Sequence, residues 1–343
     1  MKKCPQCGRR YSDIVVTCPA CAISLDASDN MVGIKQREPE NTTDRNTLSP
    51  EGYYQMGLTG EKLGDMEGAV RSYRIAAEMG NPDAQFKMGW CCFHGKGIAR
   101  DYAQAVRWYQ KAAMQENAAA QCNLGYCYEM GNGVHKDIQE AIKWYRKAAE
   151  NGEAMAQNNL GYCYEMGNGV HKDIQEAVKW YQKAAENGDA VAQHNLSGCY
   201  RRGRGVPQDY QGALKWCMLS AEQGYAAAQS DIGWHYERGY GISQSYEQAV
   251  KWYRKAAENG NAVAQYNLGL CCENGRAVSQ DYVEAVKWYS MAAEQGYANA
   301  EYRLGICYEE GRGVPINQKK AVQLYTMAAE HGNENALLKL KQQ

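Results

Sequence analysis

The chain lacks features that would indicate a membrane or secreted protein. No run of 18 apolar residues occurs in its 343 residues, so we expect no membrane-spanning helix. The first residues, MKKCPQCGRR, are basic but no apolar segment follows them, so we expect no secretory signal. We therefore expect a cytoplasmic protein, in which cysteines stay reduced or bind metal.

The chain also lacks a charge excess and is poor in phenylalanine. Its formal net charge is −1, which gives no overall attraction to nucleic acid or to an anionic membrane. It has only 2 Phe, but 26 Tyr and 8 Trp, so aromatic residues with polar tips, Ala and aliphatic residues make up the 45% hydrophobic content. This content is sufficient for a buried core, and the length allows several domains or one long repeat array.

The 14 cysteines begin with a paired motif, CPQC followed by CPAC. Cys4, Cys7, Cys18 and Cys21 have the C-x2-C-x10-C-x2-C spacing with which two knuckles bind one tetrahedral Zn²⁺. Four thiolates close the coordination shell, so we predict one structural zinc ion in a zinc ribbon over residues 1–25. The alternatives are redox C-x-x-C pairs or disulfides. The local charge of +3 leaves open a nucleic-acid-associated regulator led by the ribbon.

Residues 26–49 separate this motif from the rest of the chain. They are polar and show no hydrophobic periodicity. Such a composition is typical of a flexible linker, so we expect the ribbon to be a tethered module.

The remainder repeats with a period of 36 residues. The pair Ala-Ala occurs at 112/113, 148/149, 184/185, 256/257, 292/293 and 328/329. The first glycine of a G-x-G turn keeps the same period, at Gly95, Gly131, Gly167, Gly203, Gly239, Gly275 and Gly311. A fixed period of this length indicates stacked copies of one supersecondary unit.

Each period predicts two helices, which we call helix A and helix B. In the third copy helix A is expected at about 119–130, where Ala120, Leu124 and Tyr128 form one apolar stripe. Gly125 recurs at its position in most copies, although a mid-helix glycine costs about 1 kcal/mol relative to alanine. A repeated cost of this kind predicts a close approach between helices.

Helix B is bounded by its capping residues. Its expected N-caps are Asp65, Asp101, Asp137, Asp173, Asp209, Ser245, Asp281 and Asn317. A glycine in the left-handed conformation is expected to end it in most copies. Where helix B ends before the third copy, Glu116-Asn117 stands instead of Asn-Gly, and we expect Asn117 to supply the left-handed residue. One such hairpin cannot bury its own apolar face, whereas stacked hairpins can.

The pattern L-G-x-x-Y-x-x-G-x-G-V-x-x-D-x-x-x-A-x-x-W-Y-x-K-A-A-x-x-G resembles the SEL-one-like repeat, a relative of the tetratricopeptide repeat. The resemblance covers residues 50–343. It implies an all-α, right-handed α/α superhelical solenoid of about eight 36-residue helix pairs. It also implies a non-enzymatic scaffold or adaptor that binds a protein or peptide on its concave face, lined by helix A. A ninth helix A is expected after the eighth pair, from NENALLKLKQQ.

We call the residues at one helix-A position in all copies a column. Three columns of helix A vary from copy to copy, whereas the columns that form the core barely change, and this contrast predicts a partner surface. Its residues are Phe86, Trp90, Phe93, Tyr126, Glu129, Tyr162, Glu165, His194, Arg201, Trp234, Glu237, Arg238, Tyr266 and Tyr302. Aromatic and Arg side chains often carry most of the energy of an interface. The alternative is drift on a solvated face.

A ladder of helix-A cysteines is interpreted as core filler, because copies about 10 Å apart lie beyond disulfide reach. The chain also resembles the cysteine-rich Helicobacter members of the family, some of which are described as binding or hydrolysing β-lactams. The helix-B cysteines that staple those proteins are alanines here, such as Ala113 and Ala149, and no Ser-x-x-Lys occurs. We therefore predict no catalytic residues and keep a β-lactam-directed activity only as a second alternative.

Overall fold

The computed structural model describes residues 2–3, 10–11 and 48–341. Strands β1 (Lys2–Lys3) and β2 (Arg10–Tyr11) form an antiparallel pair, with Lys2 opposite Tyr11. Cys4, Cys7, Cys18 and Cys21 lie outside the described residues, as do residues 26–47 of the expected linker over 26–49. The zinc site therefore stays a prediction.

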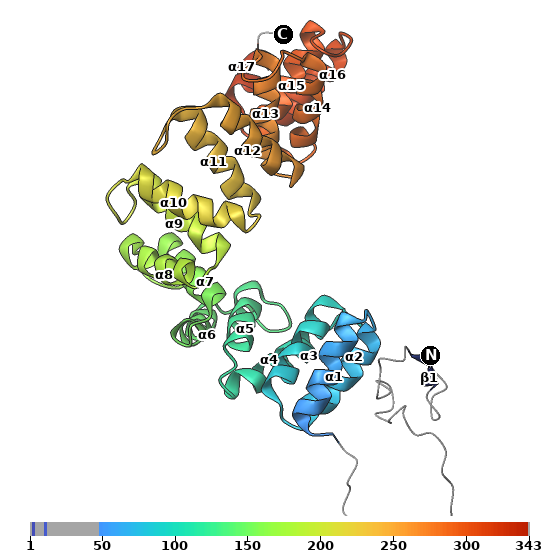
Figure 1. Cartoon of the computed structure of the whole chain (residues 1–343). Helices are drawn as coiled ribbons and strands as arrows, with labels where there is room; N and C mark the ends of the chain where they lie inside the picture. The colour runs from blue at the N-terminus through green and yellow to red at the C-terminus, as the bar shows by residue number, and fades with distance from the viewer. Residues whose placement is uncertain (1, 4–9, 12–47, 342–343) are drawn as a thin grey trace, which may run out of the picture. The chain divides into compact units, whose positions relative to one another are not determined.

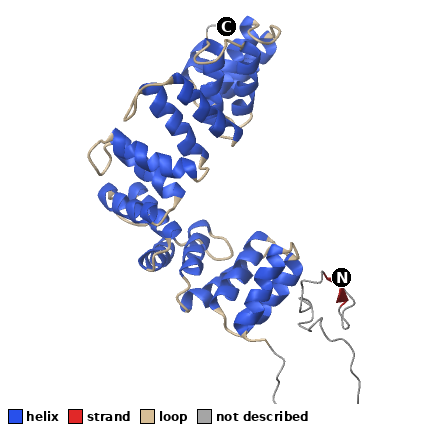
Figure 2. Ribbon diagram, viewed as in Figure 1, coloured by secondary structure: helices blue, strands red, loops and turns tan. Residues whose placement is uncertain are grey.

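From Pro50 onward the described residues form helices joined by short turns (Figure 2). The chain divides into two compact units. Unit 1 comprises residues 1–156 and 168–170, and its helices are α1 (Pro50–Lys62), α2 (Met66–Glu78), α3 (Pro82–His94), α4 (Tyr102–Met114), α5 (Ala118–Met130) and α6 (Ile138–Glu150). The following helix, α7 (Ala154–Met166), begins in unit 1 and continues in unit 2.

Unit 2 comprises residues 157–167 and 171–343. Its further helices are α8 (Ile174–Glu186), α9 (Ala190–Arg202), α10 (Tyr210–Glu222), α11 (Ala226–Arg238), α12 (Tyr246–Glu258), α13 (Ala262–Asn274), α14 (Tyr282–Ala293), α15 (Ala298–Glu310), α16 (Gln318–Glu330) and α17 (Glu334–Leu340). Odd-numbered helices are helix A and even-numbered helices are helix B. We number the eight pairs as repeats 1 to 8, and α17 is the expected ninth helix A.

Within each unit a helix packs chiefly against the helices before and after it in the chain (Figure 1). The prediction of an all-α solenoid of eight helix pairs is thus confirmed. The core is formed by the alanines of helix B, its tyrosine, and the leucine and cysteine of helix A. Ala113, Tyr109, Leu124 and Cys127, for example, are all fully buried in unit 1.

The helix boundaries follow the expected capping residues. Each predicted helix-B N-cap accepts a hydrogen bond from a backbone N–H of the first turn; Asp173, for instance, accepts from Glu176. One expectation was wrong. The left-handed residue that ends α4 is Glu116, with φ of 64°, whereas Asn117 has φ of −65° and caps the next helix. The asparagine side chain is needed for that cap, because it accepts the N–H of Ala120.

Candidate functional site

In an ordinary repeat, the mid-helix glycine of helix A lies against a tyrosine of helix B. A Cβ added at Gly161 would lie 2.8 Å from Cδ1 of Tyr181, closer than carbon atoms can approach. The ring crosses this gap, and its hydroxyl donates a hydrogen bond to Glu165 at 2.7 Å. The repeated glycine therefore makes room for a buried aromatic ring, which is the close approach that the sequence predicted.

The same tyrosine–glutamate hydrogen bond recurs through both units. The pairs are Tyr73–Glu61, Tyr145–Glu129, Tyr181–Glu165, Tyr253–Glu237, Tyr289–Glu273 and Tyr325–Glu309. Glu129, Glu165 and Glu237 were predicted to face a partner. The structure gives them a role inside their own helix pair, which sequence reasoning missed although the 16-residue spacing was visible. Their contact with a partner stays a prediction.

Repeat 5 departs from this arrangement at three positions together. Ser197 stands where the other copies have glycine, Cys217 replaces the tyrosine, and Arg201 replaces the glutamate. Cys217 is much smaller than tyrosine and leaves space for the serine side chain. Its thiol points to the carbonyl oxygen of Ala228, 3.3 Å away. Because Cys217 lacks the tyrosine hydroxyl, no donor is left that requires a glutamate acceptor at the position of Arg201.

A small pocket of about 70 Å³ opens at this repeat in unit 2. Its site residues come from three helices and one turn: His194, Arg201 and Arg202 from α9, Asp231 from α11, Glu165 from α7, and Arg204 from the turn after α9. Gly198 has no side chain, whereas the other copies have a large aromatic or aliphatic residue at this position, such as Tyr162, Trp234 or Leu270. A Cβ at Gly198 would meet only the flexible end of Arg202.

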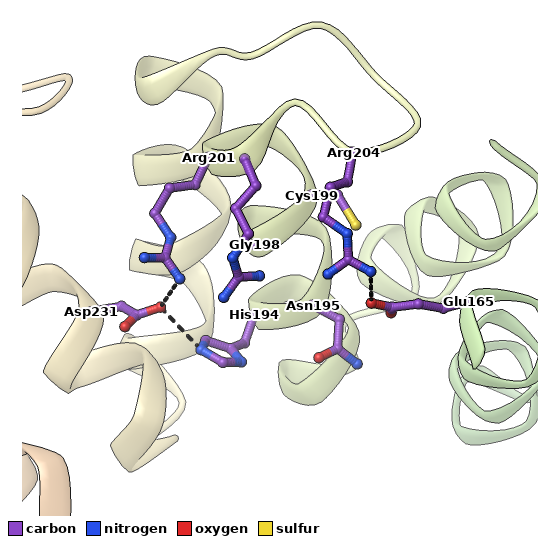
Figure 3. Close-up of a pocket in the computed structure, with 9 residues that line it drawn as sticks. Glu165, His194, Asn195, Gly198, Cys199, Arg201, Arg204 and Asp231 are labelled. Carbon is purple, nitrogen blue, oxygen red and sulfur yellow. Dashed lines mark hydrogen bonds and ion pairs between the residues drawn. The ribbon is translucent and has the colours of Figure 1, made fainter. Parts of the chain in front are cut away.

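Two ion-pair groups line the pocket (Figure 3). Asp231 lies 3.2 Å from Nε2 of His194 and 3.6 Å from Nη2 of Arg201. Burial disfavours the charged carboxylate of Asp231, but the hydrogen bond from His194 and the charge of Arg201 together outweigh it and hold its pKa below the usual value. On the other side Arg204 donates to Glu165 at 2.5 Å.

Arg201 is packed as well as paired. Its guanidinium lies over the ring of Trp234, 5.0 Å from the ring centre, which is a cation–π contact. Its Nε–H is buried and has no acceptor among the described residues. The structure thus brings His194, Arg201 and Trp234 together, as three members of the predicted surface.

The remaining predicted residues divide between packing and exposure. Tyr266 and Tyr302 lie against the rings of the buried tyrosines of their own pairs, with centroids 5.9 and 5.6 Å apart, and Phe86 does the same at 6.1 Å. In unit 1 Trp90 and Phe93 are half-buried, and both rings contact His94. The exposed members are Tyr126, Tyr162 and Arg238.

The ten cysteines of the described residues are all buried and none of them forms a disulfide, as the core-filler interpretation predicted. Burial raises the pKa of the Cys127 thiol to about 12, so it stays protonated at neutral pH. Over residues 48–341 and the two strands, no group of three His, Cys, Asp or Glu side chains could hold a metal ion. No helix in the described part of the chain is long and apolar enough to cross a membrane.

Sequence reasoning also missed a second ladder, formed by a buried glutamine of helix A. Gln121 donates to the carbonyl oxygen of Ala113 and accepts from Asn151 of the next helix-B end. In repeat 8 this pair is replaced by Glu301 and His331, whose Nδ1 lies 2.9 Å from the carboxylate. The signal was the A-x-A-Q motif, which has the same 36-residue period.

The fold and the capped helix pairs define an α-helical repeat solenoid. The Sel1 repeat model matches residues 50–81, 82–117, 118–153, 154–189, 190–225, 226–261, 262–297 and 298–333. The chain therefore belongs to the Sel1 repeat family.

Two solved structures share the repeat architecture. One is a protective antigen present in uropathogenic Escherichia coli strains displaying an SLR fold, with 36% identity and a TM-score of 0.68. The match covers 84% of this chain but only 63% of the length of the antigen. The other is a Sel1 repeat protein from Oxalobacter formigenes, with 34% identity and a TM-score of 0.65, covering 85% of this chain and 87% of that protein. No curated protein matches the chain.

Proposed function

We propose that the protein is a non-enzymatic scaffold or adaptor that binds a protein or peptide through the helix-A face. By this face we mean the three variable columns of helix A that include Trp90, Arg201 and Trp234. The observation that carries the proposal is the contrast between columns. The buried positions repeat almost unchanged, whereas the columns of His194 and Trp234 differ between copies, and the third column departs from glutamate at Phe93 and Arg201. These positions present half-buried aromatic and Arg side chains.

The Sel1-repeat solenoid supports this proposal because its side-chain chemistry suits binding better than catalysis. The described cysteines are all buried, and burial raises the pKa values of thiols such as Cys127 and Cys271, which makes these thiols poor nucleophiles. Asp231 and Glu165 are engaged in ion pairs with arginines. Within one unit, by contrast, stacked helix pairs offer several neighbouring anchor points to one partner.

The test compares two tryptophans of unit 1 that lie on different helices. Trp90 is half-buried on helix A, whereas Trp108 is half-buried on helix B and lies under Lys111. Proteins captured by the wild-type chain are quantified by mass spectrometry and compared with those captured by Trp90→Ala and Trp108→Ala. We expect Trp90→Ala to lose the specific partners and Trp108→Ala to keep them, with equal helicity by circular dichroism. Equal capture by all three chains would refute the assignment of the face.

A further inference from the structure

Repeat 5 carries a reversal of charge within an otherwise acidic column. The position of Arg201 holds glutamate in six of the other repeats and Phe93 in repeat 2. Arg202 and Arg204 follow it, in the run R-R-G-R. The chain as a whole has a net charge of −1, so this concentration of positive charge is a local property of one repeat. Local charge of one sign selects partners of the opposite sign.

The cations of the pocket outnumber its anions. Three arginines line it with two carboxylates, Glu165 and Asp231, so one positive charge is left when histidine is counted as neutral. The uncompensated cation is Arg202, which is exposed and forms no ion pair with any described residue. The pocket therefore offers one uncompensated positive charge to an incoming anion.

The size of the pocket restricts what that anion can be. Its volume of about 70 Å³ is far below the roughly 300–1,000 Å³ of cavities that enclose drug-sized ligands. The space exists because Gly198 lacks the large side chain found in the other copies. It can admit the end of one side chain, while the rest of the ligand lies outside. One negative charge on the ligand balances the one surplus positive charge of the pocket. A doubly charged phosphate would leave a net negative charge beside the carboxylates of Glu165 and Asp231.

We propose that the repeat-5 pocket binds the carboxylate of an Asp or Glu side chain of a peptide that lies along the helix-A face. The carboxylate pairs with Arg202 beside Gly198, and Arg201 and Arg204 stay held by Asp231 and Glu165. Planar guanidinium groups bind carboxylates through two parallel hydrogen bonds, which gives geometric selectivity as well as attraction. This inference rests on the proposed function and names the chemistry of the partner at one position.

The experiment uses a random 12-residue peptide library displayed on phage and the full-length chain as bait. Peptides are selected separately on the wild type, on Arg202→Gln and on Gly198→Tyr, which restores the bulky residue of the neighbouring copies and closes the pocket without changing charge. The matched control is Arg146→Gln, an equal change of charge on the exposed surface of α6. The almost identical next repeat already has Gln182 at that position, so this substitution is tolerated.

We expect peptides selected on the wild type and on Arg146→Gln to share an acidic residue at a fixed position, and the two pocket variants to lose that preference. For a selected peptide, changing its acidic residue to the amide should weaken binding to the wild type about tenfold or more, measured by calorimetry. The same change should have little effect on binding to Arg202→Gln.

The outcomes separate this inference from the proposed function. The inference is overturned if the enriched peptides share no fixed acidic position, or if both pocket variants still select that acidic residue. The scaffold proposal stands in either case. The inference is also overturned, in favour of phosphate recognition, if millimolar inorganic phosphate displaces the peptides and changing their acidic residue to the amide does not weaken binding. If no peptide is enriched on the wild-type chain, this inference fails, and the capture comparison of Trp90→Ala with Trp108→Ala still decides the scaffold proposal.

Discussion

The tyrosine hydroxyls of helix B offer a test of the packing within one unit. Tyr145 and Tyr109 are both fully buried and occupy the same position in adjacent repeats. Tyr145 donates to Glu129 at 2.6 Å, whereas the hydroxyl of Tyr109 has no partner among the described residues because Phe93 stands in the glutamate position. Replacing each by phenylalanine removes one oxygen atom and leaves the ring in place. The two variants therefore isolate the hydrogen bond from the packing.

We expect the two substitutions to have different effects on stability. Tyr145→Phe removes a hydrogen bond to a charged group, which contributes about 1.5–3 kcal/mol, and leaves Glu129 without its donor. Tyr109→Phe removes a buried hydroxyl that pays a desolvation cost without a hydrogen bond, so it should be neutral or stabilise by up to about 1–3 kcal/mol.

The assay must resolve single repeats, since a repeat array need not unfold in one step. Amide hydrogen exchange followed by mass spectrometry measures the opening of α6 and α4 separately. For Tyr145→Phe we expect faster exchange in α6, by about tenfold or more, and for Tyr109→Phe unchanged or slower exchange in α4. Equal acceleration in the two variants would show that the ring environment, and not the hydroxyl's partner, decides stability.

Three further predictions follow from individual residues. Burial lowers the pKa of His235, so on acidification the unfolded chain binds a proton there, at about pH 6.5, before the folded chain does. The free energy of unfolding should therefore fall as the pH drops below about 6.5, by up to about 1.4 kcal/mol per pH unit. His235→Cys, which restores the residue of the neighbouring copies, should reduce this slope in urea denaturation, and an unchanged slope would contradict the assignment. Glu116→Gly should stabilise repeat 2 by about 0.5–1 kcal/mol, because glycine adopts a φ of 64° without strain; an unchanged or lower urea midpoint would argue against it. For the predicted zinc ribbon, elemental analysis should find one zinc per chain and none in Cys18→Ser; equal zinc in both would exclude the site.

The sequence predicted the helix pairs because their signals are local and periodic. Capping residues such as Asp173 act within one turn of helix, and the apolar stripe of helix A needs no knowledge of its neighbours. The expectation at Asn117 failed because it departed from the repeat. The 36-residue period places Glu116 in register with the left-handed glycines Gly80 and Gly152, and it leaves Asn117 free to cap the next helix.

The candidate site was only partly predictable, for a different reason. His194 and Arg201 were singled out because they differ from the other copies, but their common partner Asp231 lies 30 or more residues away and was not suspected. A missing side chain gives no positive signal, so Gly198 does not stand out as a site residue in the sequence alone. Glu129 was placed on a free face because its hydrogen bond to Tyr145 depends on how helix B packs across helix A.

The joint change at Ser197, Cys217 and Arg201 also bears on how such a chain can be altered over time. Glycine, tyrosine and glutamate form one packing unit, so exchanging any one alone leaves a clash, a void or an unpaired group. Duplication of a whole repeat copies all three at once and avoids these intermediates. Residues 124–150 and 160–186 differ at only two positions, as such a copying event would leave them. Lengthening the array is thus an easier route to a new binding surface than revising the interior of an existing repeat.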